Sequence, residues 1–125
     1  MEFVWDPRKA KDNLRKHGVD FADAVIALED ENALTIEDQD HDEQRFKTLG
    51  MGPTLNVLYV VHCEQSTDSI RIISARKADK KETKTYFQDL SYEEIARSLK
   101  RSLSSVKSDL FRARKLLAER LKDIV

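Results

Sequence analysis

The sequence contains a single cysteine, Cys63, so an intramolecular disulfide bond cannot form. This absence fits a reducing compartment, and we expect the protein in the cytoplasm, with Cys63 as a small core residue. The longest apolar run, Val57–Val61, is far too short to span a bilayer. Glu2 and Asp6 interrupt the start of the chain, so a signal peptide is not expected. No internal repeat or low-complexity tract is present. A membrane partner is therefore excluded from the prediction.

Charge is divided unevenly along the chain. Of the 125 residues, 36% are charged and 40% are hydrophobic, which is typical of a globular protein with a polar surface. The length allows one domain, or a small domain with an appendage. Residues 1–87 contain 13 Lys and Arg against 17 Asp and Glu, a net charge of −4. Residues 88–125 contain 9 against 6, a net charge of +3. The positive C-terminal part favours a nucleic-acid partner there.

The first part of the chain alternates between helical and strand-like patterns. Asp6-Pro7 predicts the start of a helix and Gly18 predicts its end, and a second helix follows Asp20. Strands are predicted at residues 2–5, 33–37, 45–49, 55–63 and 69–75. The segment 55–63 is apolar on both faces, so we expect it at the centre of the sheet. With a closing helix at 77–87, the order predicts an α+β fold: a small antiparallel sheet with flanking helices.

Cations gather where the last predicted strand meets the closing helix. They surround Glu82 and Tyr86 and comprise Arg71, Arg76, Lys77, Lys80, Lys81 and Lys84. Cleavage of RNA needs a base for the 2′-hydroxyl, positive charge against a phosphorane-like transition state, and an acid for the leaving oxygen. Glu82 suits the base, Arg76 and Lys81 suit charge stabilisation, and His62 on the neighbouring strand suits proton exchange. Tyr86 suits stacking on a base.

Each of these residues also has a purely structural interpretation. Lys and Glu four apart on a helix usually form solvated pairs worth roughly 0.2–0.5 kcal/mol. A lone strand histidine such as His62 is commonly a packing residue, and Tyr86 is equally suited to anchoring a core. From the residues alone, only the cation cluster favours a function. The acidic loop formed by His41 with Asp38, Asp40 and Asp42 lacks EF-hand spacing, so neither a metal nor another cofactor is expected.

The last third of the chain predicts a helix-turn-helix. The segment Ser91–Glu94 has the form of a capping box that begins a helix. We expect this helix to end where Lys100–Ser102 interrupts the apolar pattern, and a second helix to begin at Ser104. Small hydroxyl and basic side chains on the second helix suit the major groove of DNA. An ordinary amphipathic hairpin explains the same periodicity, so the pattern alone leaves both interpretations open.

Four motifs occur in order in the first part of the chain: Phe3-Val-Trp-Asp-Pro7, Asn13-Leu-Arg-Lys-His-Gly-Val-Asp-Phe21, Asp40-His-Asp-Glu-Gln-Arg-Phe46 and Arg71-Ile-Ile-Ser-Ala-Arg-Lys-Ala78. Together they resemble the BrnT family of bacterial toxins, over about residues 1–86. The resemblance implies a RelE-like fold and a ribonuclease that arrests translation, held inactive by a BrnA-type antitoxin. It also implies that the activity lies around Arg71, Arg76, Lys81 and Glu82.

Two further motifs, Leu90-Ser-Tyr-Glu-Glu-Ile-Ala96 and Ser105-Val-Lys-Ser-Asp-Leu-Phe-Arg-Ala-Arg-Lys-Leu-Leu117, resemble region 4 of sigma-70-type factors over about residues 80–122. In that family the helix pair binds the −35 promoter element. The resemblance implies DNA contacts by Ser105, Lys107, Ser108, Arg112 and Arg114. Region 2 of such factors is absent, so the chain is not a working sigma factor by itself.

We therefore predict a BrnT-like toxin-fold domain at residues 1–87 and a helix-turn-helix at residues 88–125, with no linker between them. The leading hypothesis is a metal-independent endoribonuclease of a toxin–antitoxin system, carrying a DNA-binding tail. One alternative is a non-enzymatic transcription regulator that uses the toxin fold as a scaffold. Another is a tail that masks the RNase face. RNA, DNA and an antitoxin are the expected partners, and a homodimer is left open.

Overall fold

The computed structural model describes residues 1–39, 43–105 and 110–124 of the chain. In chain order its elements are β1 (Glu2–Val4), α1 (Pro7–His17), α2 (Phe21–Leu28), β2 (Leu34–Asp38), β3 (Arg45–Met51), β4 (Val57–Ser66), β5 (Ser69–Lys77), α3 (Lys80–Gln88), α4 (Tyr92–Ser105) and α5 (Leu110–Ile124). The α+β class predicted from the sequence is confirmed. No helix in the described ranges combines the length and apolarity needed to cross a bilayer.

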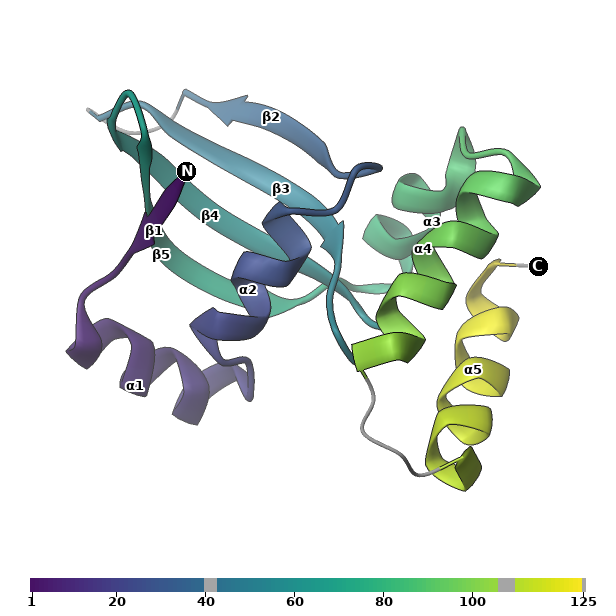
Figure 1. Cartoon of the computed structure of the whole chain (residues 1–125). Coiled ribbons are helices and arrows are strands. Elements are labelled where there is room, and N and C mark those ends of the chain that lie inside the picture. The colour runs from purple at the N-terminus through teal and green to yellow at the C-terminus, as the bar shows by residue number, and fades with distance from the viewer. Residues whose placement is uncertain (40–42, 106–109, 125) are drawn as a thin grey trace.

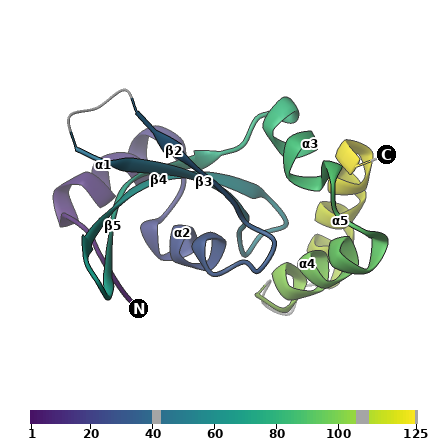
Figure 2. The same cartoon turned by 90° about the horizontal axis from the view of Figure 1, so that it is seen from above.

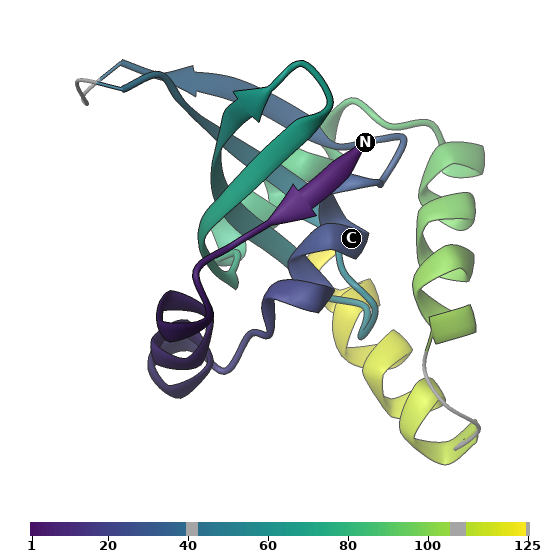
Figure 3. The same ribbon diagram turned by 60° about the vertical axis from the view of Figure 1, so that its left-hand side comes forward.

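The strands form one sheet in the order β1-β5-β4-β3-β2 (Figure 1). Strands β2 to β5 are an antiparallel meander, as predicted, whereas β1 lies parallel to β5 at the edge (Figure 3). Strand β4 occupies the centre, which confirms the expectation drawn from its apolar run. Cys63, on this strand, is buried as expected of a core residue.

Helices α1 and α2 lie on one face of the sheet (Figure 2). Their ends follow the local signals: the Asp6 carboxylate accepts from the Arg8 N–H at 2.8 Å, and Gly18 ends α1 with a left-handed φ of 69°. The core beneath them comprises Val19, Phe21, Ala24, Ala27, Leu58, Val60, Ile72 and Ala75. A Cβ atom at Gly50 would lie 2.1 Å from the Ala27 carbonyl oxygen, so glycine lets α2 approach β3 closely.

Helices α3, α4 and α5 gather at one end of the sheet (Figures 1 and 2). They enclose a second apolar cluster, whose buried members are Met51, Leu55, Val57, Tyr86, Phe87 and Leu99. Ile95, Leu103 and Leu117 pack against it from α4 and α5. The helices that follow residue 90 are therefore packed on the end of the sheet and share a core with it.

Polar contacts anchor α4 to the sheet end as well. The buried Ser102 hydroxyl donates to the Gly52 carbonyl at 2.7 Å and accepts from the Leu55 N–H at 2.6 Å. Leu55 has a left-handed φ of 61°, which is uncommon for a leucine, and the bond that its N–H donates to Ser102 helps to hold that conformation. The Arg101 guanidinium donates to the Ile26 carbonyl at 2.6 Å and to the Met51 carbonyl at 3.3 Å.

Two predicted boundaries were wrong. The closing helix begins at Lys80, because β5 continues to Lys77 and Asp79 caps the helix. The turn predicted at Lys100–Ser102 is helical, and α4 continues to Ser105. Arg101 and Ser102 extend the face of α4 that binds the sheet end, so they continue the helix where the apolar pattern alone indicated a break. Ser104 does not cap a second helix; its hydroxyl donates to the Arg101 carbonyl within α4.

Candidate functional site

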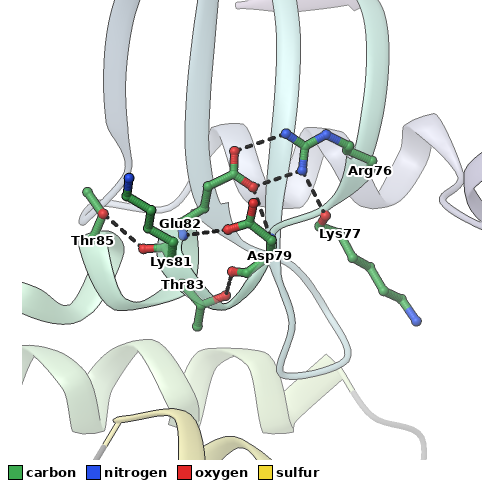
Figure 4. A network of polar contacts seen from close by, with 7 residues as sticks. All are labelled: Arg76, Lys77, Asp79, Lys81, Glu82, Thr83 and Thr85. Atoms are coloured by element: carbon green, nitrogen blue, oxygen red, sulfur yellow. Dashed lines mark hydrogen bonds and ion pairs between the residues drawn. The ribbon is translucent and has the colours of Figure 1, made fainter.

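The end of β5 and the first turn of α3 bring an arginine and a glutamate together. Asp79 is the N-cap of α3, and its carboxylate accepts from the Glu82 N–H at 2.7 Å. The Glu82 carboxylate in turn accepts from the Asp79 N–H at 2.9 Å, which completes a capping box. Because this box orients the Glu82 side chain at the helix start, its carboxylate meets Arg76 across the short β5–α3 connection (Figure 4).

Arg76 and Glu82 form a two-pronged ion pair. The two terminal nitrogens of Arg76 lie 2.8 and 2.9 Å from the two carboxylate oxygens of Glu82. The Arg76 guanidinium also lies over the ring of Tyr59, 4.1 Å from its centroid. Arg76 is 37% exposed and Glu82 23%, so the pair is held in place while remaining open to solvent on one side.

This pairing sets the charge state of both groups. The Arg76 hydrogen bonds hold the pKa of the Glu82 carboxyl below its usual value, with a further contribution from the Asp79 N–H. The bond to Glu82 raises the pKa of Arg76. Glu82 is therefore a carboxylate at neutral pH, and its two oxygens already accept from Arg76. The fixed Arg76 guanidinium can bind a phosphate. The solvent-accessible Glu82 carboxylate beside it can accept a proton.

The predicted cation cluster divides between two sides of the structure. Lys81 lines a hollow of approximately 390 Å³ on the open face of the sheet, together with Glu82 and Tyr59. Figure 4 shows Lys81 and Glu82 extending from α3 toward the strands. Lys77 and Lys80 line a different hollow, of approximately 330 Å³, together with Arg120 of α5. Of the three predicted lysines that line these two hollows, Lys81 shares its hollow with Glu82, whereas Lys77 and Lys80 do not.

Arg71 lies on the same face as Arg76 but farther along β5. It pairs with Cys63 in the sheet register, whereas Arg76 pairs with Tyr59. Five residues of extended chain separate the two arginines by roughly 15 Å. The Arg71 guanidinium lies 3.2 Å from a Glu43 carboxylate oxygen. The structure therefore does not bring Arg71 into the Arg76–Glu82 pair.

His62 lies on the opposite face of the sheet. It is 7% exposed, pairs with Phe46 in the register and stacks on its ring. Its Nε2 atom is 2.8 Å from the Thr48 hydroxyl. Burial lowers the pKa of His62 to about 4. The residue is a neutral packing histidine at physiological pH, and the structure does not bring it to Glu82.

Tyr86 is 1% exposed and lies in the second apolar cluster. Its hydroxyl donates to the Asp30 carboxylate and lies 2.7 Å from the Ser98 hydroxyl oxygen. Burial, followed by the bond to Asp30, raises its pKa. A base has no exposed ring face on which to stack here, so the structural interpretation of Tyr86 as a core anchor is the one its surroundings support.

Tyr59 was missed in the sequence reasoning. It belongs to the central strand, and the alternation of side chains there gave no sign that Arg76 would lie over its ring. Only the register between β4 and β5 brings the two residues opposite each other. A predicted β4–β5 register would have been the one signal able to identify it.

Most of the predicted DNA-contacting residues lie outside what the structure describes. Lys107 and Ser108 are outside the described residues, and the side chains of Ser105 and Arg112 are not described. Arg114 is exposed on α5. Of the acidic loop, Asp40 to Asp42 are also outside; in the described ranges, no group of three His, Cys, Asp or Glu side chains could hold a metal ion.

Comparison with known proteins divides the chain in two. The family described as "Ribonuclease toxin, BrnT, of type II toxin-antitoxin system" matches residues 5–82, and the family described as "Sigma-70, region 4" matches residues 83–117. The crystal structure of the Brucella abortus ribonuclease toxin BrnT is similar, with a TM-score of 0.53 and 27% sequence identity, over 63% of this chain and 97% of that chain. No curated protein gives a significant match.

The five-stranded sheet with two helices on one face is a toxin–antitoxin ribonuclease fold. The first match covers more than half of the chain, and the chain belongs to the BrnT toxin family. A sigma-70 region 4-like segment follows. Both predicted resemblances are confirmed. The two matches meet at residues 82 and 83, inside α3, so each family match includes part of this helix.

Proposed function

We propose that this protein is an endoribonuclease whose reacting groups are Arg76, Lys81 and Glu82 on the open face of the sheet. The observation that carries the proposal is the two-pronged Arg76–Glu82 pair, which is partly exposed to solvent and whose Glu82 lines a hollow together with Lys81. A planar guanidinium presents parallel donors that match phosphate oxygens as well as carboxylate oxygens. Membership of a ribonuclease toxin family supports RNA as the source of that phosphate.

The proposed reaction starts from the Arg76–Glu82 pair. When a phosphate of RNA binds, Arg76 donates to it and releases one Glu82 oxygen. That oxygen takes the proton of the 2′-hydroxyl, and the 2′-oxygen attacks phosphorus. The bond to the 5′-oxygen breaks, leaving a 2′,3′-cyclic phosphate. The leaving oxygen takes a proton from water, and the resulting hydroxide takes the proton from Glu82, which restores the carboxylate. Arg76 and Lys81 stabilise the negative charge of the transition state. Arg71 is assigned to the RNA backbone away from the cleaved bond.

Purified protein and a fluorescent RNA test this proposal. Glu82→Gln keeps the shape of the side chain but cannot accept a proton as a carboxylate does, so cleavage should slow by about 10²–10⁴-fold. Arg76→Lys keeps the charge but loses the fork, and it should slow cleavage as well. Arg15→Lys changes an exposed arginine of α1 that pairs with Asp12, and it is the matched control. An inactive wild type, or a fully active Glu82→Gln, would overturn the proposal.

A second activity, DNA binding, is supported by the match of residues 83–117 to sigma-70 region 4. We propose that α4 and α5 bind DNA. The contacting residues in this proposal are Ser105, Lys107, Ser108, Arg112 and Arg114. Gel retardation of promoter-type DNA should weaken as salt rises. If the exposed Arg114 contacts a phosphate, Arg114→Ala should reduce the slope of log affinity against log salt concentration by about 1. A slope unchanged by Arg114→Ala would remove that residue from the interface.

The alternative in which residues 88–125 mask the ribonuclease face is less well supported than the proposal above. The face of α3 that carries Thr83, Tyr86 and Phe87 is buried toward the tail and the core, whereas Lys81 and Glu82 extend toward the sheet. The described part of the tail therefore packs behind α3 and leaves the Arg76–Glu82 pair open. We expect the proposed cleavage of RNA and binding of DNA to take place in the cytoplasm. A BrnA-type antitoxin and a homodimer stay predictions for this chain.

A further inference from the structure

The hollow beside the Arg76–Glu82 pair has an apolar floor that the proposed cleavage reaction does not use. Its floor is built from cross-strand pairs on the open face of the sheet: Leu34 of β2 pairs with Leu49 of β3, which pairs with Tyr59 of β4. Ile36 continues this surface along β2, the edge strand. Leu34 is 41% exposed and Ile36 is 64% exposed. Large aliphatic side chains exposed next to one another indicate a contact surface.

Two lysines and one glutamate line the same hollow. Lys47, on β3, pairs with Ile36 in the register and lines the hollow from the sheet. Lys81 and Glu82 line it from α3. The Asp38 carboxylate is 3.8 Å from the Lys47 ammonium, and Glu82 is held by Arg76. An apolar floor with two ammonium groups beside it matches a molecule that has one flat apolar part and anionic groups attached to it.

We propose that this hollow is a subsite for one unpaired nucleobase of RNA, with the base against Leu34, Ile36, Leu49 and Tyr59 and a flanking phosphate at Lys81. The inference rests on the proposed ribonuclease function, because it assigns the hollow to the substrate. A volume of approximately 390 Å³ accommodates a single nucleotide. A base inside a duplex reaches such a hollow only by leaving its stack, so single-stranded RNA is the substrate class.

Charge argues for RNA over a second copy of this chain as the occupant. A second copy whose two-fold axis passed at Lys81 or Lys47 would bring that ammonium group toward its own counterpart. Like charges brought together in this way are unfavourable. RNA instead brings phosphates toward these cations and a base toward the apolar floor.

The test measures binding of full-length protein to RNA that cannot react. A short, unstructured 2′-O-methyl RNA lacks the attacking hydroxyl, and its fully abasic counterpart keeps the phosphates while lacking every base. Fluorescence anisotropy should show the abasic strand binding about ten-fold more weakly than the base-bearing strand. The same RNA in duplex form should bind more weakly than the single strand.

Ile36→Glu supplies the residue-level test. It places a carboxylate on the exposed floor. The affinity for the base-bearing strand should fall about ten-fold and so become equal to the affinity for the abasic strand. Leu14→Glu is the matched control, because Leu14 is 48% exposed on α1, which covers the other face of the sheet. It should leave both affinities unchanged.

Three results would overturn the subsite. Equal binding of base-bearing and abasic strands would show that the protein contacts phosphates only. An Ile36→Glu effect that is the same for both strands would show that the new carboxylate merely repels the backbone. Loss of self-association in Ile36→Glu, measured by sedimentation, with unchanged RNA binding would assign the floor to a second copy. These differ from failure of the proposed function, in which RNA with its 2′-hydroxyl is not cleaved at all.

Discussion

The phenol oxygen of Tyr86, in α3, lies 2.7 Å from the hydroxyl oxygen of Ser98, in α4, and both side chains are buried. Tyr86 also donates to Asp30, whose carboxylate accepts from the Met51 N–H at 2.7 Å. Asp30 and Met51 belong to the part matched by the BrnT family, whereas Tyr86 and Ser98 belong to the part matched by sigma-70 region 4. One buried polar network thus joins the two.

Removing the phenol hydroxyl should reveal how much this network contributes. Tyr86→Phe leaves the Asp30 carboxylate and the Ser98 hydroxyl each with one partner fewer in a buried place. The free energy of unfolding should fall by about 1–3 kcal/mol, measured by urea denaturation. Tyr92→Phe makes the same chemical change at a side chain that is 92% exposed, and should have little effect. Equal losses in the two variants would contradict a structural role for the network.

The whole chain should unfold in one cooperative transition. Leu99, on α4, shares an apolar cluster with Met51 and Val57 at the sheet end, so neither part can open without exposing the other's core. Trp5, the only tryptophan, packs edge-on against Phe21 and reports on the toxin fold by fluorescence. Far-UV circular dichroism reports on all the helices. The two denaturation curves should coincide; an earlier helical transition would show instead that residues 88–125 fold independently, as the predicted domain boundary implies.

Acid should weaken the Arg76–Glu82 pair in a defined direction. The pKa of Glu82 is lower in the folded state than its ordinary value of 4.5, so the unfolded state binds a proton more readily. The pair therefore stabilises the fold fully above pH 4.5, and this stabilisation is lost as the pH falls through the folded pKa. The difference in unfolding free energy between wild type and Glu82→Gln should shrink from pH 7 to pH 3. A constant difference would show that Arg76 does not lower the Glu82 pKa.

His62 should also make the protein less stable as the pH falls, but over a higher pH range than Glu82. Its folded pKa of about 4 lies below the ordinary value of 6.5, because burial disfavours the charged ring. As the pH falls from 6.5 to 4, the unfolded state gains a proton that the folded state does not, and stability decreases by up to about 3 kcal/mol. In His62→Gln that decrease should be absent. The variant should also cleave RNA as well as wild type does, since His62 lies on the far face of the sheet; a large loss of cleavage would restore it to the site.

The parts of the structure that depend on local chemistry could be predicted. Asp6 and Gly18 bound α1 because a side-chain cap and a left-handed residue act within a few positions of the chain. The central place of β4 followed from its apolar run. Arg76 and Glu82 are six residues apart, and the strand-to-helix change between them was visible in the pattern. Their juxtaposition was therefore within reach of sequence reasoning.

Contacts between distant segments could not be predicted in the same way. Tyr59 meets Arg76, and Ile36 joins the same hollow, only through the registers of three strands. His62 suited proton transfer by residue type, yet strand alternation turns it to the helix-covered face. Tyr86 suited base stacking until α3 and α4 enclosed it. A slip of one residue in register would exchange the two faces, and no local signal specifies that register.

The amino-acid sequence by itself determined the order of strands and helices, the family of the first part, and the likeness of the second to sigma-70 region 4. These properties rest on hydrophobic periodicity, capping residues and motifs, all of which act over short stretches of chain. Only the tertiary structure decided that α4 continues through Lys100 to Ser105. Arg101 and Ser102 bond to the carbonyls of Ile26 and Gly52, more than forty residues earlier in the chain, and those distant partners favour helix where the local pattern predicted a turn.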